Sequence, residues 1–63
     1  MNEPFKIGDR VYHKNLETYG IFDSYDWASD DSCFVCFEDE YGHNDDYRCV
    51  SLNQLIKVDK KEN

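Results

Sequence analysis

Cys33-Phe34-Val35-Cys36-Phe37-Glu38 is the segment with the strongest strand character in this chain of 63 residues. Aromatic residues and valine suit the pleated, half-buried surface of a β-sheet. Because successive side chains of a strand point to opposite faces, we expect the odd-numbered residues of this segment to point into a core. Its even-numbered residues, Phe34, Cys36 and Glu38, then point outward.

Four more short strands are expected around this segment, each bounded by turn-forming residues. They lie at Arg10–Lys14, Tyr19–Tyr25, Tyr47–Val50 and Ile56–Val58. In the first of them, Val11 and His13 share one face and Tyr12 takes the other. In the second, Gly20 indicates a bend or a bulge.

A single turn of 3₁₀ helix is expected at Ser51–Leu55, where two leucines stand three residues apart. No part of the chain shows the roughly 10 to 12 residues of helical periodicity that a longer helix requires. Five short strands with one helical turn before the last predict an all-β fold, a five-stranded SH3-like (Tudor-like) barrel in a single domain. Barrel closure also removes the exposed edges of an open sheet. We expect an ordered core over about residues 5–58 and a flexible tail at 59–63.

Acidic and aromatic residues are concentrated in the same part of the chain. Between Lys14 and Arg48, 33 residues contain no Lys or Arg, yet they hold ten carboxylates and eight of the ten aromatic residues. The net charge is −7, and all seven basic residues lie toward the two ends. The aromatic content distinguishes this chain from a disordered acidic tail. We therefore expect a folded domain whose negative middle attracts basic partners, with the positive ends clear of it.

The chain has three cysteines and no recognisable signal peptide. It also lacks an apolar run near the roughly 20 residues that span a membrane. We therefore expect a cytoplasmic protein without membrane contact. In a reducing compartment, an odd number of cysteines indicates free thiols rather than a disulfide framework.

Cys33, Cys36, His43 and Cys49 resemble the ligand set of a zinc knuckle. Their spacing differs from that of a knuckle, and positions i and i+3 of a regular strand face opposite ways. We therefore expect no metal and no other cofactor, and we interpret the cysteines as small apolar strand residues. A small zinc-binding domain that uses these four residues stays as an alternative.

The turn at 39–46 and the two histidines carry the remaining candidate chemistry. Asp39, Asn44, Asp45 and Asp46 offer oxygen ligands for calcium, but no EF-hand loop frames them, so at most a weak, nonspecific site is expected. His13 is expected to be a core histidine hydrogen-bonded near a turn, and His43 is expected in solvent. Neither histidine has a nucleophile beside it in sequence, and exposed acids lack the shielding that acid–base catalysis needs. We expect no enzyme.

An outward aromatic patch in acidic surroundings is the expected partner-binding site, because interfaces favour aromatic anchors inside a polar rim. Phe34 is the expected anchor, joined by Tyr25 and Trp27. Two alternatives stay open: Trp27 folds over the barrel as a lid, or the rings form a cage for methylated lysine. The acidic residues expected around the patch are Asp30, Asp31, Glu38, Asp39, Glu40, Asp45 and Asp46.

Gly8-Asp9-Arg10-Val11-Tyr12-His13, followed by Tyr19-Gly20-Ile21, resembles the opening of bacterial Tudor-like barrels. These include the C-terminal domain of UvrD/PcrA helicases and the RNA-polymerase-interacting domain of CarD and Mfd. The ending is similar too, with Val35 and Phe37 in one strand, an acidic turn, and then Val50-Ser51-Leu52 and Leu55. The resemblance implies a binding module without catalysis that contacts the transcription or DNA-processing machinery.

Two functions of different class are therefore expected. The first is a non-catalytic, acidic protein-interaction module that docks on a basic or apolar patch of a larger intracellular machine. The second is a DNA mimic that inhibits a host nucleic-acid-binding protein, since size and charge resemble the small proteins that phages use against host nucleases and polymerases. Direct nucleic-acid binding is not expected, because the ten carboxylates repel phosphates.

Overall fold

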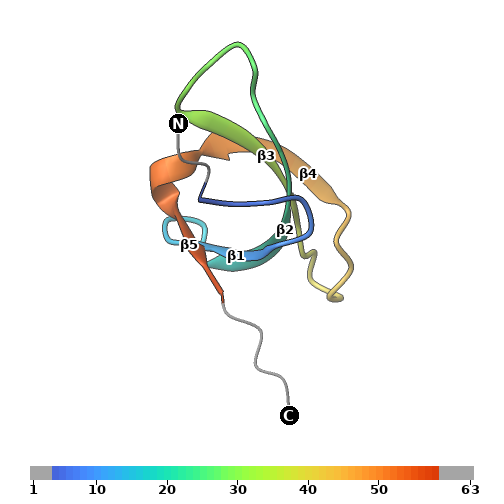
Figure 1. Ribbon diagram of the computed structural model, residues 1–63. Coiled ribbons are helices and arrows are strands. Elements are labelled where there is room, and N and C mark those ends of the chain that lie inside the picture. Colours follow the sequence, from blue (N-terminus) through green and yellow to red (C-terminus); the bar gives the residue numbers. More distant parts are fainter. Residues whose placement is uncertain (1–3, 59–63) are drawn as a thin grey trace.

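The computed structural model describes residues 4–58, which contain five strands and one turn of 3₁₀ helix (Figure 1). The elements are β1 (Arg10–His13), β2 (Thr18–Tyr25), β3 (Ser32–Phe37), β4 (Asp46–Ser51), η1 (Leu52–Gln54) and β5 (Leu55–Lys57). Each element begins and ends within one residue of its expected position. The all-β fold with a 3₁₀ turn before the last strand is therefore confirmed for the described residues. The tail expected at 59–63 lies outside them.

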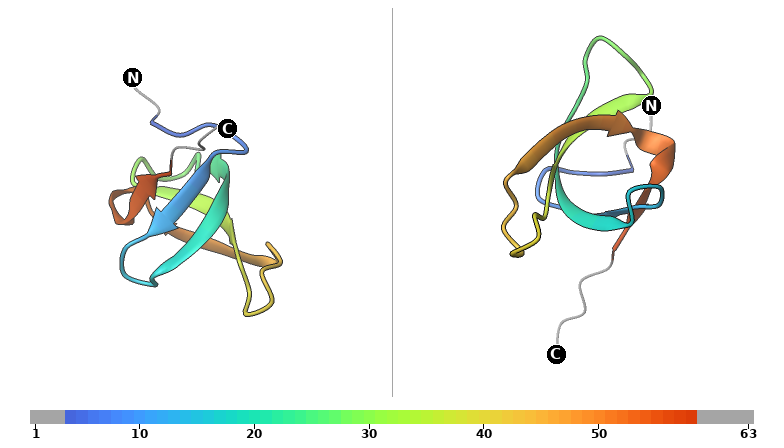
Figure 2. Two further views of the ribbon diagram at one scale, coloured as in Figure 1. Left: turned by 90° about the horizontal axis from the view of Figure 1, so that it is seen from below. Right: turned by 180° about the vertical axis from the view of Figure 1, so that it is seen from behind.

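The five strands form one antiparallel sheet with the order β4-β3-β2-β1-β5. The sheet curls strongly around its own concave side, and η1 connects its two outer strands (Figures 1 and 2). Within residues 4–58 no strand pairing joins β4 to β5. The hydrogen bonds therefore define an open, curled sheet, and they do not show the closure expected of a barrel.

The concave side of the sheet holds the core, which consists of Phe5, Val11, Phe22, Cys33, Val35, Phe37 and Leu55. In β3 the odd-numbered residues are buried, whereas Phe34 and Cys36 lie half-buried on the other side. In β1, Val11 and His13 point inward and Tyr12 points outward. The expected alternation of both strands is confirmed.

Gly20 stands at a point of close packing rather than at a bend. It pairs in regular register with Val11 and Phe37, and the register shift of β2 against β3 lies further on, between Phe22 and Ser24. A Cβ atom at Gly20 would lie 2.7 Å from Val35 Cγ1 and 2.9 Å from Phe37 Cδ1. The expected bulge at Gly20 is therefore wrong, because the glycine serves to let the inner side chains of β3 approach the backbone of β2.

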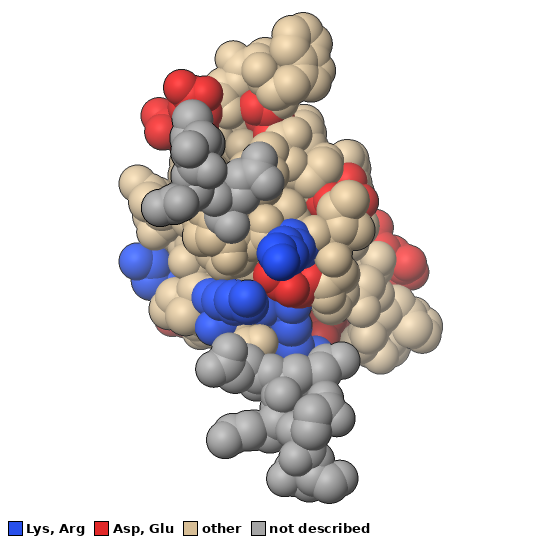
Figure 3. Space-filling view, in the orientation of Figure 1, with Lys and Arg blue, Asp and Glu red and all other residues tan. Residues whose placement is uncertain are grey.

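Basic side chains gather over β1 and β5 in Figure 3, while most Asp and Glu side chains lie toward the periphery of that face. Basic and acidic side chains nevertheless meet in three Lys or Arg ion pairs among the described residues. They join Arg10 to Glu38 at 3.3 Å, Arg48 to Asp46 at 3.0 Å, and Lys57 to Asp9 at 3.5 Å. The separation of charge expected from the sequence is therefore only partial.

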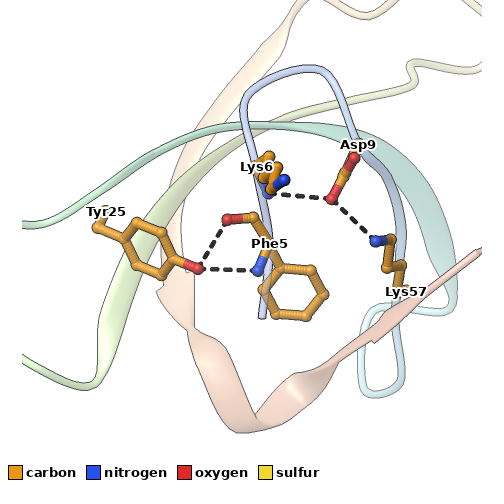
Figure 4. Close-up of polar contacts among 5 residues, drawn as sticks. All are labelled: Phe5, Lys6, Asp9, Tyr25 and Lys57. Carbon is orange, nitrogen blue, oxygen red and sulfur yellow. Dashed lines mark hydrogen bonds and ion pairs between the residues drawn. The ribbon is translucent and has the colours of Figure 1, made fainter. Parts of the chain in front are cut away.

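Residues 4–9 close one end of the curled sheet (Figure 4). The Phe5 ring is buried and stacks on Phe22 with a centroid distance of 5.5 Å. The hydroxyl of Tyr25 accepts a hydrogen bond from Phe5 N and donates one to Phe5 O, both at 2.8 Å. Beyond a turn at Gly8, the carboxylate of Asp9 accepts a hydrogen bond from Lys6 N at 2.9 Å. That bond, with help from Lys57, holds the pKa of Asp9 below its ordinary value.

His13 ends β1 as a buried histidine. Its Nδ1 atom accepts a hydrogen bond from Leu16 N at 3.0 Å, and its ring meets Phe37 edge-on at 5.7 Å. Burial, and secondly the charge of Arg48, lowers the pKa of His13. The expectation of a core histidine hydrogen-bonded near a turn is confirmed.

Candidate protein-interaction surface

The convex side of the sheet carries an uncovered apolar surface, which we call the outer face. It consists of Tyr12, Tyr19, Ile21, Phe34, Cys36, Tyr47, Cys49 and Ile56. Strand register makes it continuous, because Ile21 pairs with Cys36, Cys36 with Tyr47, and Phe34 with Cys49. Among residues 4–58, Tyr19, Tyr47, Cys49 and Ile56 of this face are exposed and its other four residues are half-buried. An exposed apolar patch on a small domain is typical of an interaction surface.

Two aromatic pairs stiffen the outer face. Phe34 and Tyr47 stack with a centroid distance of 5.6 Å and an interplanar angle of 5°. Tyr12 and Tyr19 meet at 4.9 Å, and the guanidinium of Arg10 lies 4.7 Å from the Tyr19 ring centroid. Such pairs restrict side-chain rotation before any partner arrives, which lowers the entropic cost of binding.

The polar contacts at the outer face stabilise the carboxylate of Asp23 and pair the nearby cation Arg10. The hydroxyl of Tyr47 donates to Asp23 Oδ2 at 3.4 Å, and Ser24 donates to the same oxygen at 3.1 Å. Local desolvation of the hydroxyl, together with the charge of Asp23, raises the pKa of Tyr47. Arg10, the cation of this region, is paired with Glu38. The face therefore presents aromatic rings and carboxylates with its positive charge already neutralised.

Two acidic loops lie at opposite ends of β3: residues 26–31 before it and residues 38–45 after it (Figure 1). The six residues of β3 span about 20 Å. Each loop carries one exposed aromatic side chain, Trp27 at 96% and Tyr41 at 76% exposure. The loops are shaped by their own carboxylates, since Asp26 accepts a bond from Ala28 N, and Asp39 accepts bonds from Tyr41 N and His43 N.

The acidic residues expected at the partner site divide between these loops. Asp30 and Asp31 lie in the first loop, and Glu38, Asp39, Glu40 and Asp45 lie in the second, with Asp46 opening β4. They form two groups rather than one continuous band. The reason is topological, because a hairpin strand places the turns before and after it at opposite ends of the sheet.

The three expected aromatic residues do not converge on one patch. Phe34 points outward as expected. Trp27 projects into solvent, so the alternative in which it forms a lid is wrong; Phe5 covers the end of the sheet instead. Tyr25 is turned toward the core, where its ring contacts Phe22 at 4.8 Å and its hydroxyl holds Phe5. The structure therefore provides no cage around Trp27 among the described residues.

The sequence interpretation placed Tyr12 on the outer side of its strand but included none of the outer-face tyrosines in the candidate site, and Tyr47 is the main omission. Alternation from Val50 already places Tyr47 outward, so its direction was predictable. Its stack on Phe34 was not, because the register between β3 and β4 depends on the conformation of the long turn between them.

The cysteines lie on both sides of the sheet. Cys33 is buried in the core, and burial raises the pKa of its thiol to about 11. Cys36 and Cys49 belong to the outer face, and Cys49 is exposed. Cys33 therefore points away from the other two thiols, and the side chain of His43 is exposed in the second acidic loop. This arrangement gives the zinc alternative no support.

One group of potential metal ligands is close enough to share an ion within residues 4–58: Asp39, His43 and Asp45. All three belong to the second acidic loop, where Asp39 Oδ2 lies 3.7 Å from His43 Nδ1. The group overlaps the residues expected to offer weak calcium ligands, with His43 in place of Asn44 and Asp46. It is an exposed set without a buried ligand.

Two hollows of about 470 and about 420 Å³ flank Phe5 at the closed end of the sheet. The first is lined by Pro4, Phe5, Asp31, Ser51, Leu52 and Asn53. The second lies between Phe5 and β2. No histidine or cysteine lines either hollow.

Comparison of the chain with protein-family models, with curated proteins and with solved structures finds no match in any of the three. Within the described residues, no helix has the length and apolar character that a membrane crossing requires.

Proposed function

We propose that this protein is a non-catalytic interaction module that docks its acidic loops on a basic patch of a larger protein. The observation that carries the proposal is the exposed aromatic side chain in each acidic loop, Trp27 and Tyr41. Aromatic anchors within a polar rim are the side chains that contribute most to protein interfaces. A nearly fully exposed tryptophan adds no hydrophobic stabilisation to the fold itself, so its apolar surface is available to a partner.

The electrostatic part of the proposal rests on carboxylates without internal partners. Asp26, Asp30 and Asp31 form no ion pair within residues 4–58, and neither do Glu40 and Asp45. Their charge is therefore available to a cationic partner. Because all are exposed or half-exposed, their attraction acts over about one Debye length, which is ~10 Å at 0.1 M salt.

We further propose that the curled sheet is an SH3-like (Tudor-like) barrel that is joined at η1 and stays open along the rest of β4. Supporting features are the strand order and the position of η1 between β4 and β5. A hydrogen bond of 2.8 Å from Leu52 N to Asp31 O also ties the end of β4 to the loop before β3. Together with the resemblance to the UvrD/PcrA and CarD/Mfd domains, this fold favours a partner in the transcription or DNA-processing machinery. Three free thiols favour the cytoplasm as its location.

Affinity capture from a bacterial lysate at low salt, followed by mass spectrometry, tests the interaction. The double variant Asp30→Asn/Asp31→Asn and the variant Trp27→Ala should lose the captured partner, because they remove charge and anchor from one loop. Glu17→Gln is the matched control, since it removes one exposed carboxylate from the β1–β2 turn, which belongs to neither loop. Capture of no specific partner at low salt, or equal loss in the control, contradicts the proposal.

Imitation of DNA is the second candidate, and the net charge of −7 is the observation that favours it. The division of the acids into two groups at opposite ends of β3 makes it the weaker candidate, because duplex DNA presents a charge about every 1.7 Å of its axis. A mimic should compete with duplex DNA for one captured protein, and this competition should fail in the variant that neutralises Asp30, Asp31, Asp39 and Glu40. If the captured protein still binds DNA when it is saturated with this chain, mimicry is contradicted and the interaction module still stands.

A further inference from the structure

β4 is hydrogen-bonded on one side only. Among residues 4–58 it pairs with β3 and with no other strand. The pairing runs without a register shift from Ser32↔Ser51 to Phe37↔Asp46, so all six residues of β4 are extended. The opposite edge, β5, has only three residues. β4 therefore presents the longer row of unpaired backbone N–H and C=O groups, to which another strand can bind.

The outward side chains at this edge form a compact apolar strip. We call Phe34, Cys36, Tyr47 and Cys49 the β4 strip. They make two directly opposed pairs, Phe34↔Cys49 and Cys36↔Tyr47, and the Phe34 ring stacks on Tyr47 across the diagonal. Tyr47 and Cys49 are exposed, so the strip is open to a partner that approaches the edge.

Part of the usual protection of an edge strand is missing from β4. Exposed edges are commonly protected by proline, by a bulge or by charged side chains. β4 contains no proline, its register is regular, and its outward residues Tyr47 and Cys49 are uncharged. Its one cation, Arg48, is held by Asp46, whose two carboxylate oxygens lie 3.1 and 3.0 Å from Nε.

Carboxylates stand at both ends of this edge. At its start is Asp45 of the second acidic loop, beside the Asp46 that pairs with Arg48. At its end, the bond from Leu52 N to Asp31 O places Asp31 next to η1, directly after β4. A chain that pairs along β4 therefore meets negative charge at both of its ends and apolar side chains between them.

We propose that β4 docks an extended segment of a partner protein, which adds to the sheet as a sixth strand. The segment carries apolar side chains at alternate positions over about six residues, or ~20 Å, and Lys or Arg at both ends. This inference rests on the proposed interaction function and specifies its partner. A second copy of this chain is the poorer occupant, because it brings a charge of −7 to an acidic edge.

A synthetic peptide tests the edge directly. The probe has seven residues of alternating valine and threonine with two lysines at each end, and its control has glutamate in place of each lysine. In ¹⁵N-edited NMR spectra of the full chain, the lysine peptide should shift the amide signals of residues 46–51 and slow their hydrogen exchange. It should bind at least tenfold more tightly than the glutamate peptide. A third peptide with proline at its centre should not bind, because proline cannot complete the ladder.

Variants of the strip separate strand addition from simple charge attraction. Tyr47→Ala should weaken binding of the lysine peptide at least tenfold. Cys49→Asp should also weaken it, although charge attraction alone would strengthen it. Ile7→Ala and Leu16→Ala are the controls, since each removes an exposed apolar side chain outside β4 and both acidic loops, and they should change the affinity less than twofold. A well-dispersed NMR spectrum shows that each variant is folded.

The thiols provide a second readout in the unaltered chain. The exposed Cys49 should react with iodoacetamide, and saturating peptide should slow this reaction at least fivefold, while the buried Cys33 stays unmodified throughout. Unchanged alkylation of Cys49 under saturation overturns the proposal.

The remaining outcomes distinguish this inference from the function on which it rests. Signal shifts confined to the loops 26–31 and 38–45 overturn strand addition at β4 and leave acidic docking in place. Equal binding of the lysine and glutamate peptides overturns the inference that the partner segment is cationic. A dimer that forms through β4 overturns the inference that another protein supplies the sixth strand, since a second copy of this chain would then supply it. Failure of the peptide together with failure of lysate capture overturns both proposals.

Discussion

Gly20 has no space for a side chain, although its backbone conformation is ordinary for a strand. A Cβ atom there would come within 3.0 Å of Val35, Phe37 and the Cys36 carbonyl. Gly20→Ala should therefore destabilise the fold by about 1–3 kcal/mol, the usual cost of overpacking a core. Urea unfolding measures this change.

A double-mutant cycle shows whether the close contact is the cause. Val35→Ala removes the atom nearest to the added methyl group, so the free-energy costs of Gly20→Ala and Val35→Ala should be less than additive. An ordinary surface substitution changes the free energy of unfolding by at most about 0.5 kcal/mol. If Gly20→Ala changes it by no more than that, the packing explanation is wrong.

The same residue illustrates what a sequence can and cannot show. Glycine in a strand indicates a departure from regular pairing or a close approach, and both meanings were compatible with Gly20. The choice depends on Val35 and Phe37, which the fold brings across from another strand. Likewise, Tyr25 appeared to belong to a surface patch, because its partner Phe5 lies twenty residues away in the sequence.

At the scale of elements, all strands and the 3₁₀ turn were predictable to within one residue. Alternation and turn-forming residues are local signals, and this chain carries them without conflict. The role of residues 4–9 as a cover for the sheet was not predictable, since no local pattern indicates where Phe5 packs. The stack of Phe34 on Tyr47 likewise depends on a register that the turn between β3 and β4 fixes.

The β1–β2 turn should be sensitive to pH through His13. Its Nδ1 atom accepts the hydrogen bond from Leu16 N, so a proton on Nδ1 breaks that bond. The pKa of His13 is lowered in the folded chain, whereas an unfolded histidine titrates near pH ~6.5. The unfolded state thus binds more protons below that pH. The contribution of His13 to the free energy of unfolding should therefore be fully present above the unfolded pKa. It should fall as the pH drops toward the pKa of the folded state, by at most about 1.4 kcal/mol per pH unit.

Urea unfolding between pH 8 and pH 5.5 measures this dependence, because the carboxylates titrate mainly below that range. His13→Gln should be less stable throughout and should lose most of the slope. His43→Gln is the matched control, since it removes an exposed histidine, and it should keep the slope. An unchanged slope in His13→Gln contradicts the assignment.

At the scale of the whole molecule, composition predicted an acidic surface but not its division into two ends. The ten carboxylates of the middle region share one stretch of sequence without Lys or Arg, and the hairpin topology of β2, β3 and β4 separates most of them into two groups. Arg10 also reaches the acidic part of the surface, where it binds Glu38, because β1 pairs with β2 and β2 pairs with β3, whereas Arg48 binds Asp46 two residues before it in the same strand. The Arg10–Glu38 contact depends on which strands are neighbours, and the positions of charges along the chain do not contain that information.

Two electrostatic effects of opposite sign therefore act on stability. The net charge of −7 opposes folding, and added salt relieves it. Three ion pairs favour folding, and salt weakens them. Exposed ion pairs contribute only about 0–1 kcal/mol each and lie within a few ångströms, where screening is weakest, so relief of the net repulsion should prevail.

Raising NaCl from 10 to 150 mM shortens the Debye length from about 30 to about 8 Å. The free energy of unfolding should then rise on the order of 1 kcal/mol, which corresponds to an increase in Tm of about 4–8 °C for a domain of this size. Asp30→Asn/Asp31→Asn removes two carboxylates that have no ion pair within residues 4–58, so it should raise Tm at 10 mM NaCl and flatten the salt dependence. Lys57→Gln, which removes the partner of Asp9, should do the reverse. A Tm that falls with salt in the unaltered protein would mean that its ion pairs, rather than its unbalanced acidic loops, dominate the electrostatics of folding.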